Sequence, residues 1–338
     1  MKIGICGATG YSGREMIRIL LRHPEADLIF LSSEQSADQM ISDVFPEFRN
    51  RLDLVCQPLD SVVEKQKADV VFLALPHTVS MKAARAFLAK GIKVIDLSGD
   101  YRLDQKVYEK WYHHPHEDIE NLKSAVYGLT EFFRDQVKEA RLVSNPGCYP
   151  TCAALGLVPA IAGGWIDLDS IVIDAKSGVS GAGRSASLVN QFCEVNENLK
   201  AYKVGVHQHT PEIEKTLKHF AKRDINVTFV PHLIPMDRGI LSTVYAGWAK
   251  PCKISQVLES YQKFYHNEPF IRVLPEGVFP QTQGVCGSNY CDIGIHVDER
   301  TGRVIIVSAI DNMVKGAAGQ AVQNFNVMMG FQETTALL

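Results

Sequence analysis

The sequence lacks most of the features that mark membrane, secreted and nucleic-acid-binding proteins. Its eight cysteines form no CxxC pair, and it contains no repeat or low-complexity tract. No apolar run approaches the roughly 20 residues that span a bilayer. The formal net charge of −3 gives no reason to expect a nucleic acid or an anionic membrane as partner. The first residues resemble a strand rather than a signal peptide, so we expect a cytoplasmic protein with reduced thiols.

The length and the pattern of apolar segments predict two domains. A chain of 338 residues exceeds what one hydrophobic core usually organises. Apolar strands at 70–75 and 94–97 flank a helix at 80–90, and this alternation predicts an α/β fold with a Rossmann-type, doubly wound parallel sheet. Strand patterns at 171–175, 227–248 and 304–310 predict a second, α+β domain. We expect the boundaries 1–147 for the first domain, completed by a C-terminal helix in 312–338, and 148–311 for the second.

A glycine-rich turn lies between the first strand and the first helix. An apolar strand covers residues 2–6, and a helix with one apolar face follows the turn. The turn fits G-x-x-G-x-x-G, whose glycines let a pyrophosphate approach the backbone while the helix N-terminus attracts the anion. The alternative is an ordinary βα turn. The predicted cofactor contacts here are Gly7, Thr9, Gly10, Tyr11, Ser12 and Gly13.

The end of the next strand bears on which dinucleotide would bind. Residues 28–31 lead into Ser32-Ser33-Glu34. NAD-selective sites usually place an acid at this strand end to hold the ribose 2′-OH. Here two hydroxyl groups come first and the acid is displaced, so Ser32 and Ser33 favour NADP. The alternative is a polar loop.

The segment Val143–Thr151, with sequence VSNPGCYPT, contains the best candidate for a nucleophile. Pro150 suits the first turn of a helix, and Tyr149, which precedes a proline, is expected to lie outside that helix. Cys148 would then sit just before the helix, where backbone N–H groups and the helix dipole stabilise a thiolate. Gly147 leaves room for a substrate. The alternative is a buried cysteine that only fills space.

Two histidines precede another helix start, in the sequence HQHTPEIE. Thr210 is a good N-cap, Pro211 suits the first helical position, and the acids that follow complement the dipole. His207 and His209 are therefore expected on the loop that enters the helix. No third ligand makes a zinc site, so an imidazole that exchanges protons is the better interpretation, and we predict no metal. The tract at 113–116 is expected to be a solvated loop.

Further candidates for anion binding follow the ends of strands. Arg102 could hold a phosphate or a carboxylate in a bidentate fork, although a solvated surface arginine is equally compatible with its position. The loop at 176–184 is rich in backbone donors and suits a phosphate or a cofactor edge, with a flexible hairpin or linker as the alternative. We expect cofactor contacts at Ser180, Gly181, Gly183 and Asn312. Arg184 and Arg238 are candidates for a substrate carboxylate.

Together, these blocks resemble the N-acetyl-gamma-glutamyl-phosphate reductases, relatives of aspartate-semialdehyde dehydrogenase. The resemblance covers residues 7–13, 144–151, 177–184, 207–214 and 311–316, and it runs nearly end to end. The family often has arginine where this chain has Gln208. The resemblance implies Cys148 as the nucleophile and His207, rather than His209, as its acid–base partner. It also places His209 and Glu212 among the substrate-binding residues.

The resemblance further implies a reaction and an assembly. The reaction is the NADPH-dependent reduction of N-acetyl-L-glutamyl 5-phosphate to N-acetyl-L-glutamate 5-semialdehyde and phosphate, in arginine biosynthesis. The assembly is a homodimer or homotetramer built through the second domain. Alternatives are an aspartate-semialdehyde dehydrogenase and a dinucleotide-binding regulatory protein without catalysis. A thiol hydrolase that uses Cys148 and His207 would leave the glycine turn unexplained.

Overall fold

The computed structural model describes residues 1–338, which form two compact units. The first unit contains Met1–Pro146 and Ala317–Leu338, and the second contains Gly147–Gly316. The chain thus enters the second unit at Gly147, and it returns to the first at Ala317, a few residues later than the expected boundary at 312. That the first unit binds the dinucleotide and the second carries catalysis and assembly stays a prediction at this point.

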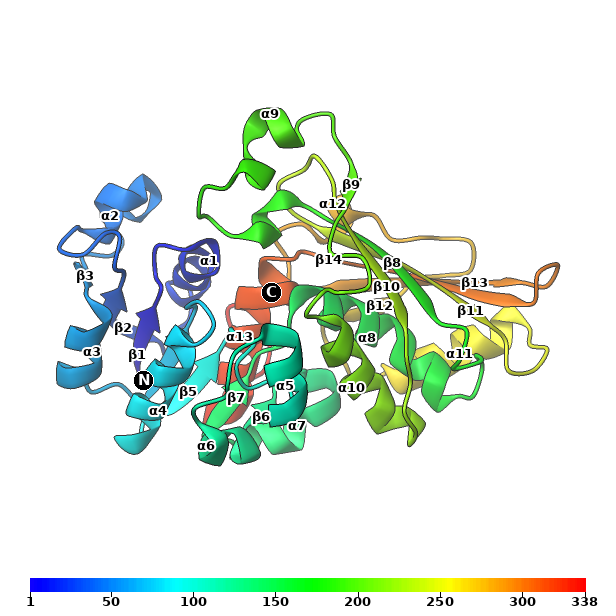
Figure 1. The fold of residues 1–338 in the computed structure, drawn as a ribbon, viewed down its shortest axis with the longest axis horizontal. Coiled ribbons are helices and arrows are strands. Elements are labelled where there is room, and N and C mark those ends of the chain that lie inside the picture. The colour runs from blue at the N-terminus through cyan, green and yellow to red at the C-terminus, as the bar shows by residue number, and fades with distance from the viewer. The chain divides into compact units, whose positions relative to one another are not determined.

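The first unit is built on a seven-stranded sheet in the order β3-β2-β1-β4-β5-β7-β6, and every strand pair is parallel. Strands β1 and β4 are buried along nearly their whole length, as expected where helices cover both faces of a parallel sheet. This confirms the predicted doubly wound fold (Figure 1). The strands are β1 Lys2–Cys6, β2 Asp27–Ser32, β3 Cys56–Gln57, β4 Val70–Leu73, β5 Lys93–Asp96, β6 Val126–Tyr127 and β7 Leu142–Ser144.

Helices of the first unit include one that comes from the far end of the chain. Helix α13 packs against α1, α7 and β5. The Phe325 ring of α13 lies 5.8 Å from that of Phe72 on β4, and Asn324 donates a hydrogen bond to Asn145. The helices are α1 Tyr11–Leu20, α2 Ile41–Val44, α3 Leu59–Lys65, α4 Val79–Ala89, α5 Gln105–Tyr112, α6 Ile119–Ser124, α7 Thr130–Glu139 and α13 Gly319–Met329, with a 3₁₀ turn at Pro46–Phe48.

The second unit has a mixed seven-stranded sheet in the order β12-β13-β14-β11-β8-β10-β9. Buried and partly exposed residues alternate along β8 and β11, as in a sheet with one face on the core. The predicted second α+β domain is therefore confirmed. The strands are β8 Val172–Ser177, β9 Lys200–Ala201, β10 Thr228–Leu233, β11 Ile240–Gly247, β12 Ile271–Val273, β13 Cys291–Asp298 and β14 Arg303–Ile310.

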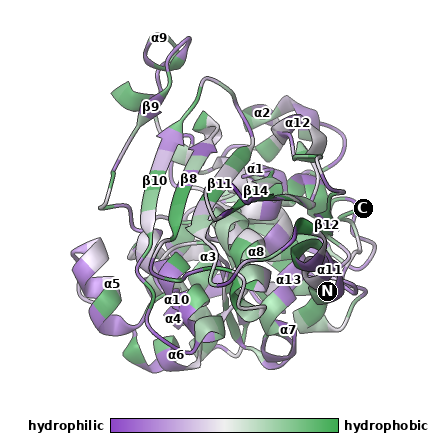
Figure 2. Ribbon diagram, turned by 90° about the vertical axis from the view of Figure 1, so that its right-hand side faces the viewer, coloured by the Kyte–Doolittle hydropathy of each residue, from purple (hydrophilic) through white to green (hydrophobic).

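Helix α8 packs on β11 and β14, and α10 and α11 pack against α8 on the same side of the sheet (Figure 1). The segment that carries α9 extends beyond the sheet in Figure 2, while β9 pairs antiparallel with β10 at the sheet edge. The helices are α8 Cys148–Ala162, α9 Phe192–Val195, α10 Thr210–Ala221, α11 Ile254–Phe264 and α12 Thr282–Val285, with 3₁₀ turns at Val179–Ala182 and Leu188–Asn190 and a π-helical turn at Val314–Ala318.

Three local expectations were wrong. Helix α8 begins at Cys148 with Gly147 as its N-cap, so Cys148 and Tyr149 lie inside the helix and not before it. Helix α10 begins at Thr210 with His209 as N-cap, one residue before the expected helix start at Pro211. His116 does not lie in a solvated loop, because it is 4 % exposed and its Nε2 hydrogen-bonds the Asp100 carbonyl. At α8 and at His116 a tertiary contact outweighs a local preference.

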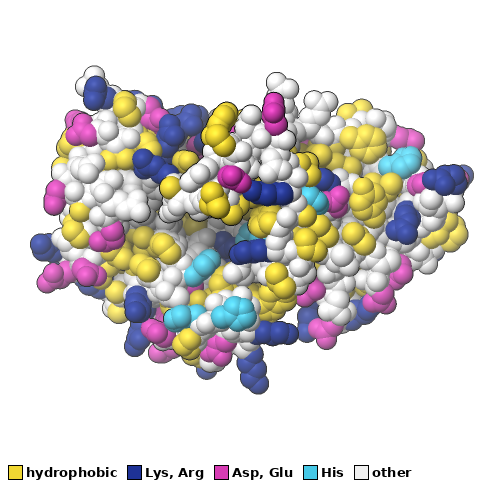
Figure 3. All heavy atoms as spheres, turned by 45° about the horizontal axis from the view of Figure 1, so that its top comes forward, with side chains coloured by type: hydrophobic (Ala, Val, Ile, Leu, Met, Phe, Trp, Pro, Cys, Tyr) yellow, Lys and Arg dark blue, Asp and Glu magenta, His cyan; other side chains and the backbone are white.

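The surface carries both signs of charge. On the face shown in Figure 3, lysine and arginine side chains are interspersed with aspartate and glutamate, as the small formal net charge of −3 suggests. No helix combines the length and the apolar character that crossing a bilayer requires.

Candidate active site

The glycine turn of the first unit has the geometry of a phosphate cradle. Gly7 has a φ of +81°, and a Cβ at this position would lie 2.2 Å from the carbonyl oxygen of Ala74. A Cβ at Gly13 would lie 2.3 Å from the Gly7 carbonyl oxygen. Helix α1 has no acidic residue in its first turn and no side-chain cap on Gly10. The N–H groups of its first turn therefore have no intrahelical partner and suit an anion.

Other predicted cofactor residues lie around this turn. The Ser32 carbonyl accepts the N–H groups of Gly7 and Ala8, which ties the end of β2 to the turn. The Ser32 hydroxyl is buried and hydrogen-bonds the Cys6 thiol. The Ser33 hydroxyl lies 2.6 Å from that of Thr9. Of the two serines, Ser33 is thus the one whose hydroxyl shares the turn with the predicted phosphate contacts.

Cys148 is the first residue of α8 and is partly exposed. At that position its N–H has no intrahelical acceptor, and the positive end of the dipole favours a thiolate. The preceding Gly147 is fixed on both sides: its N–H donates to Glu212 Oε1 at 2.8 Å, and its carbonyl accepts both the N–H and the hydroxyl of Thr151. Gly316 packs on the cysteine, since a Cβ there would lie 2.8 Å from Cys148 Cβ.

His207 is buried among aromatic rings. Its ring centroid lies 5.7 Å from that of Tyr149, 5.5 Å from Tyr202 and 5.5 Å from Phe229. Burial, and then the positive charge of Lys203, lowers the pKa of His207 to about 4. The backbone N–H of His209 donates to His207 Nδ1 at 3.1 Å. Because a backbone N–H can only donate, Nδ1 carries no proton, and a neutral ring then carries its proton on Nε2.

Two tyrosines near Cys148 pack on the His207 ring, and no sequence pattern singled out either of them as a site residue. Tyr202 donates to the Tyr149 hydroxyl at 3.3 Å, and Tyr149 donates to the His232 carbonyl at 3.1 Å. Burial is the main cause that raises the pKa of Tyr202 to about 12, and the nearby Cys148 adds to it. Tyr149 follows Cys148 directly and could have been noticed, whereas Tyr202 gives no local signal.

The predicted cofactor residues after β8 come together with Asn312. The Asn312 side chain donates to the Ser180 hydroxyl at 2.9 Å and accepts the Gly239 N–H at 2.7 Å. The Asn312 amide also lies 3.6 Å from the position of a Cβ on Gly181. Gly183 is the C-cap of the 3₁₀ turn at Val179–Ala182 and has a φ of +85°. The structure thus groups these residues, while their contact with a cofactor stays a prediction.

The three predicted anion-binding arginines have different surroundings. Arg102 is buried and donates to the carbonyls of Asn145 and Leu97, so its guanidinium braces the loops after β5 and β7. Arg238 lies 3.6 Å from the buried carboxylate of Asp311. Arg184 is exposed at the end of the 178–183 loop. Their roles toward a substrate stay predictions.

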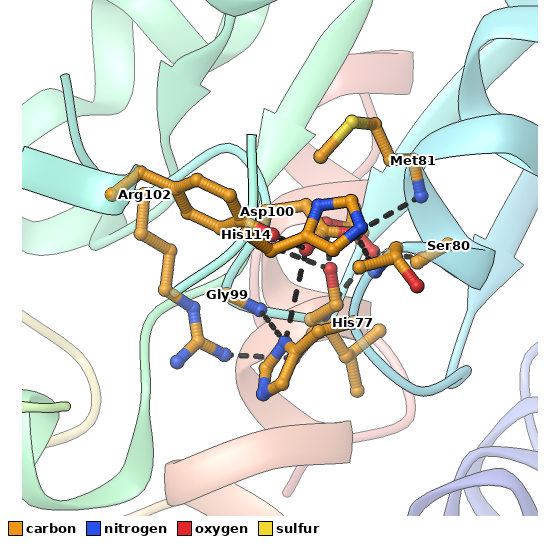
Figure 4. A network of polar contacts seen from close by, with 12 residues as sticks. His77, Ser80, Met81, Gly99, Asp100, Arg102 and His114 are labelled. Carbon is orange, nitrogen blue, oxygen red and sulfur yellow. Dashed lines mark hydrogen bonds and ion pairs between the residues drawn. The ribbon is translucent and has the colours of Figure 1, made fainter. Parts of the chain in front are cut away.

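A buried carboxylate organises the ends of β4 and β5, and sequence reasoning missed it. Asp100 Oδ2 accepts the N–H groups of Thr78 and Met81 and so caps α4, while Oδ1 accepts the Tyr108 hydroxyl. Figure 4 shows Asp100 between His77 and the start of α4, with Arg102 nearby. Burial, and then the charge of Asp100, raises the pKa of the neighbouring Asp96 to about 6. The network fixes the strand ends where doubly wound sheets bind ligands.

Comparison with known protein families agrees with this division of the chain. The semialdehyde dehydrogenase NAD binding domain matches residues 2–140, and the semialdehyde dehydrogenase dimerisation domain matches residues 148–312. Together with the fold, these matches define an oxidoreductase of the semialdehyde dehydrogenase class. The predicted class of cofactor, a nicotinamide dinucleotide, is thereby confirmed, and the glycine turn described above fits it.

Relatives over the full length define the family more closely. N-acetyl-gamma-glutamyl-phosphate reductases from Geobacter sp. (strain M21) and Desulforudis audaxviator are 54% and 52% identical to this chain, over 100% of it and 98% of each relative. The chain belongs to the N-acetyl-gamma-glutamyl-phosphate reductase family, as its motifs predicted.

Solved structures share the fold at much lower identity. Aspartate semialdehyde dehydrogenase II from Vibrio cholerae has a TM-score of 0.74 at 18% identity, with 97% of this chain and 98% of that chain covered. The Candida albicans enzyme, solved with NADP, has a TM-score of 0.69 at 17% identity, with the same coverage.

Proposed function

We propose that this protein reduces N-acetyl-L-glutamyl 5-phosphate to N-acetyl-L-glutamate 5-semialdehyde with release of phosphate, as the names of its relatives indicate. The observation that carries the proposal is the position of Cys148 as the first residue of α8, beside two tyrosines that also pack on His207. In this family, a cysteine at a helix N-terminus with an imidazole nearby suits acyl transfer through a thioester.

In the proposed reaction, the Cys148 thiolate attacks the acyl carbon of the substrate. The carbon–oxygen bond to the phosphoryl group breaks, phosphate leaves with the bonding electrons, and a thioester remains on the sulfur. The N–H groups in the first turn of α8 stabilise the oxyanion of this step. The glycine turn at residues 7–13 would hold a nicotinamide dinucleotide, which would supply the hydride that reduces the thioester carbon.

His207 then stabilises the reduced centre. Its Nε2–H donates a hydrogen bond to the oxygen of the tetrahedral intermediate as that oxygen gains negative charge. When this oxyanion collapses to the aldehyde, the carbon–sulfur bond breaks, the Cys148 thiolate leaves with the bonding electrons, and the proton stays on Nε2. Because the ring is already neutral near pH 7, it acts as a hydrogen-bond donor without first forming a charged pair with Cys148.

We further propose NADP as the dinucleotide, held at its 2′-phosphate by Ser33. Ser33 supports this because its hydroxyl lies beside Thr9 of the glycine turn. Glu34 gives further support, because its carboxylate accepts the Leu59 N–H and is thereby engaged away from a ribose hydroxyl. Ser32 supports the site through its carbonyl, as its hydroxyl is paired with Cys6.

The proposed assembly is a homo-oligomer that uses the segment around α9. This segment lies within the residues matched by the dimerisation domain, and it exposes 68% of Leu188, 76% of Phe192 and 66% of Val206. Exposed apolar side chains in such a group indicate a contact surface. Light scattering after gel filtration should therefore give a smaller mass for Phe192→Ser than for the unchanged protein. Equal masses would assign the contact to another surface.

The function is tested in the reverse direction with purified protein. We expect phosphate-dependent reduction of NADP with N-acetylglutamate semialdehyde, at a kcat/KM at least about 100-fold above that with aspartate semialdehyde. The opposite preference would make the protein an aspartate-semialdehyde dehydrogenase. Dinucleotide binding without turnover of either aldehyde would make it a regulatory protein.

A further inference from the structure

Glu212 joins the helix that carries the cysteine to the helix that follows the histidines. It lies in the first turn of α10 and is 1 % exposed. Its Oε1 accepts the N–H of Gly147 at 2.8 Å, across 65 residues of chain. This contact connects the two most specific blocks of the sequence, VSNPGCYPT and HQHTPEIE.

We propose that Glu212 is a positioning residue, which acts through Gly147 to fix the start of α8 and thereby Cys148. The proposal rests on the proposed function, and it gives Glu212 a task other than the substrate binding that the family resemblance implied. Gly147 is the N-cap of α8, so its N–H belongs to the groups that the helix itself leaves unsatisfied. A buried carboxylate supplies the acceptor that no side chain at the N-cap provides.

The surrounding contacts show why this bond controls the cysteine. The Gly147 carbonyl is already held by the N–H and hydroxyl of Thr151, at 3.0 and 2.9 Å. With its N–H on Glu212, the peptide units on both sides of the glycine are fixed. His209, the N-cap of α10, lies three residues before Glu212, and its N–H holds the His207 ring. Glu212 therefore sets the position of Cys148 relative to His207.

The same helix offers a matched control. Glu214 lies two residues further on, and its Oε1 accepts the backbone N–H of Val227 at 3.1 Å. Replacing either glutamate removes one carboxylate and one bond to a backbone N–H. Only Glu212 holds the start of α8.

The experiment compares Glu212→Ala, Glu212→Gln, Glu214→Ala and the unchanged protein in two assays. The first is turnover, and the second is alkylation of Cys148 by iodoacetamide as a function of pH. The alkylation assay needs no reductase activity, so it decides the positioning role even if the proposed substrate is wrong. Thermal unfolding of each variant shows that it is folded.

We expect Glu212→Ala to lower kcat by about 10- to 100-fold, with KM for the acyl phosphate within about threefold, because a shift in a catalytic group costs turnover more than binding. Glu212→Gln should restore most of kcat, since its amide oxygen can accept the same N–H. The alkylation pKa of Cys148 should be higher in Glu212→Ala than in Glu212→Gln by about half a unit, because a loosened helix start stabilises the thiolate less. Glu214→Ala should match the unchanged protein in both assays.

Three results would overturn the proposal. Equal behaviour of the alanine and glutamine variants would assign the effect to the charge. A tenfold rise in KM for the acyl phosphate in Glu212→Gln, with kcat kept, would return Glu212 to substrate binding. Unchanged kcat and alkylation in Glu212→Ala would show that Cys148 is positioned without it.

Discussion

Two helix starts in this protein look alike in sequence but are completed differently. Helices α1 and α8 each follow a buried strand and a glycine, and Gly10 and Gly147 are their N-caps without side-chain caps of their own. At α1 no acidic residue lies in the first turn, and the surrounding glycines leave no space for a side chain. At α8 a buried carboxylate from another helix, Glu212, takes the N-cap N–H.

The difference follows from what each helix start has to bind. A pyrophosphate brings its own negative charge, so α1 serves it best with bare N–H groups. A thiolate is part of the chain, so α8 needs its backbone fixed around Cys148 while the donors of the first turn remain for an oxyanion. A protein carboxylate at α1 would compete with the ligand, whereas at α8 it orders the helix start.

The largest expected effect comes from removing the nucleophile at the start of α8, which should abolish turnover and leave NADPH binding at the start of α1 intact. Cys148→Ser should lower turnover by roughly 10³- to 10⁶-fold, because a serine at this position is a much weaker nucleophile than a thiolate. NADPH affinity, which depends on the start of α1, should stay within about twofold. Steady-state rates and a fluorescence titration of NADPH measure the two. Normal turnover by the serine variant would end the thioester mechanism.

A side chain added at the start of α1 should have the reverse effect: NADPH binding should weaken, and the reactivity of Cys148 should be kept. Gly13→Ala would place a Cβ 2.3 Å from the Gly7 carbonyl oxygen, so the turn must distort. We expect NADPH to bind roughly 100-fold more weakly, about 3 kcal/mol, while the alkylation rate of Cys148 is kept.

A suitable control is Gly284→Ala, since a Cβ at Gly284 has its nearest neighbour at 3.8 Å. That variant should bind NADPH normally. Equal weakening in both variants would point to general destabilisation rather than to the cradle.

The two helix starts were also unequally predictable from sequence. The α1 start follows from local chemistry, because the alternation in residues 2–6 and the spaced glycines define the turn without distant residues. The cysteine of α8 was found from its block, but the helix was expected to begin after Tyr149. Tyr149 precedes a proline and was therefore expected to avoid the helical conformation. This preference is outweighed because Glu212 and Thr151 hold Gly147 in the N-cap geometry.

Residues distant in sequence account for the rest of what was missed. Tyr202 and Gly316 reach Cys148 only through the fold, and neither belongs to a pattern that indicates catalysis. Arg102 donates to the carbonyls of Leu97 and Asn145, contacts that its position in the sequence did not indicate, and its role toward an anion stays a prediction. His116 was assigned to solvent because its neighbours in sequence are polar, whereas the Asp100 network buries it.

The stability of the protein should decrease at acidic pH because of His207 in the second unit. The pKa of His207 is lowered to about 4, so between pH 6.5 and 4 the unfolded chain binds a proton that the folded chain does not. Stability is therefore lost as pH falls through this window. Between pH 8 and 5 the loss from this group is about 2 kcal/mol.

Urea unfolding at both pH values measures this loss, and His207→Asn gives the reference. Asparagine cannot titrate, and its side-chain oxygen can still accept the His209 N–H. The variant should therefore lose about 2 kcal/mol less than the unchanged protein on acidification. The same loss in both proteins would mean that His207 is charged in the folded state.

The smallest expected effect concerns the packing of Cys148 itself. A Cβ at Gly316 would lie 2.8 Å from Cys148 Cβ and 3.2 Å from its Cα, so Gly316→Ala has to move the first residue of α8 or the π-helical turn. We expect kcat to fall about tenfold, because a displaced nucleophile loses its alignment, with NADPH affinity unchanged. The effect should be smaller than that of Cys148→Ser because the thiol remains. If Gly316→Ala turns over at the normal rate, the start of α8 tolerates movement, and its contrast with the rigid turn before α1 would lie in charge alone.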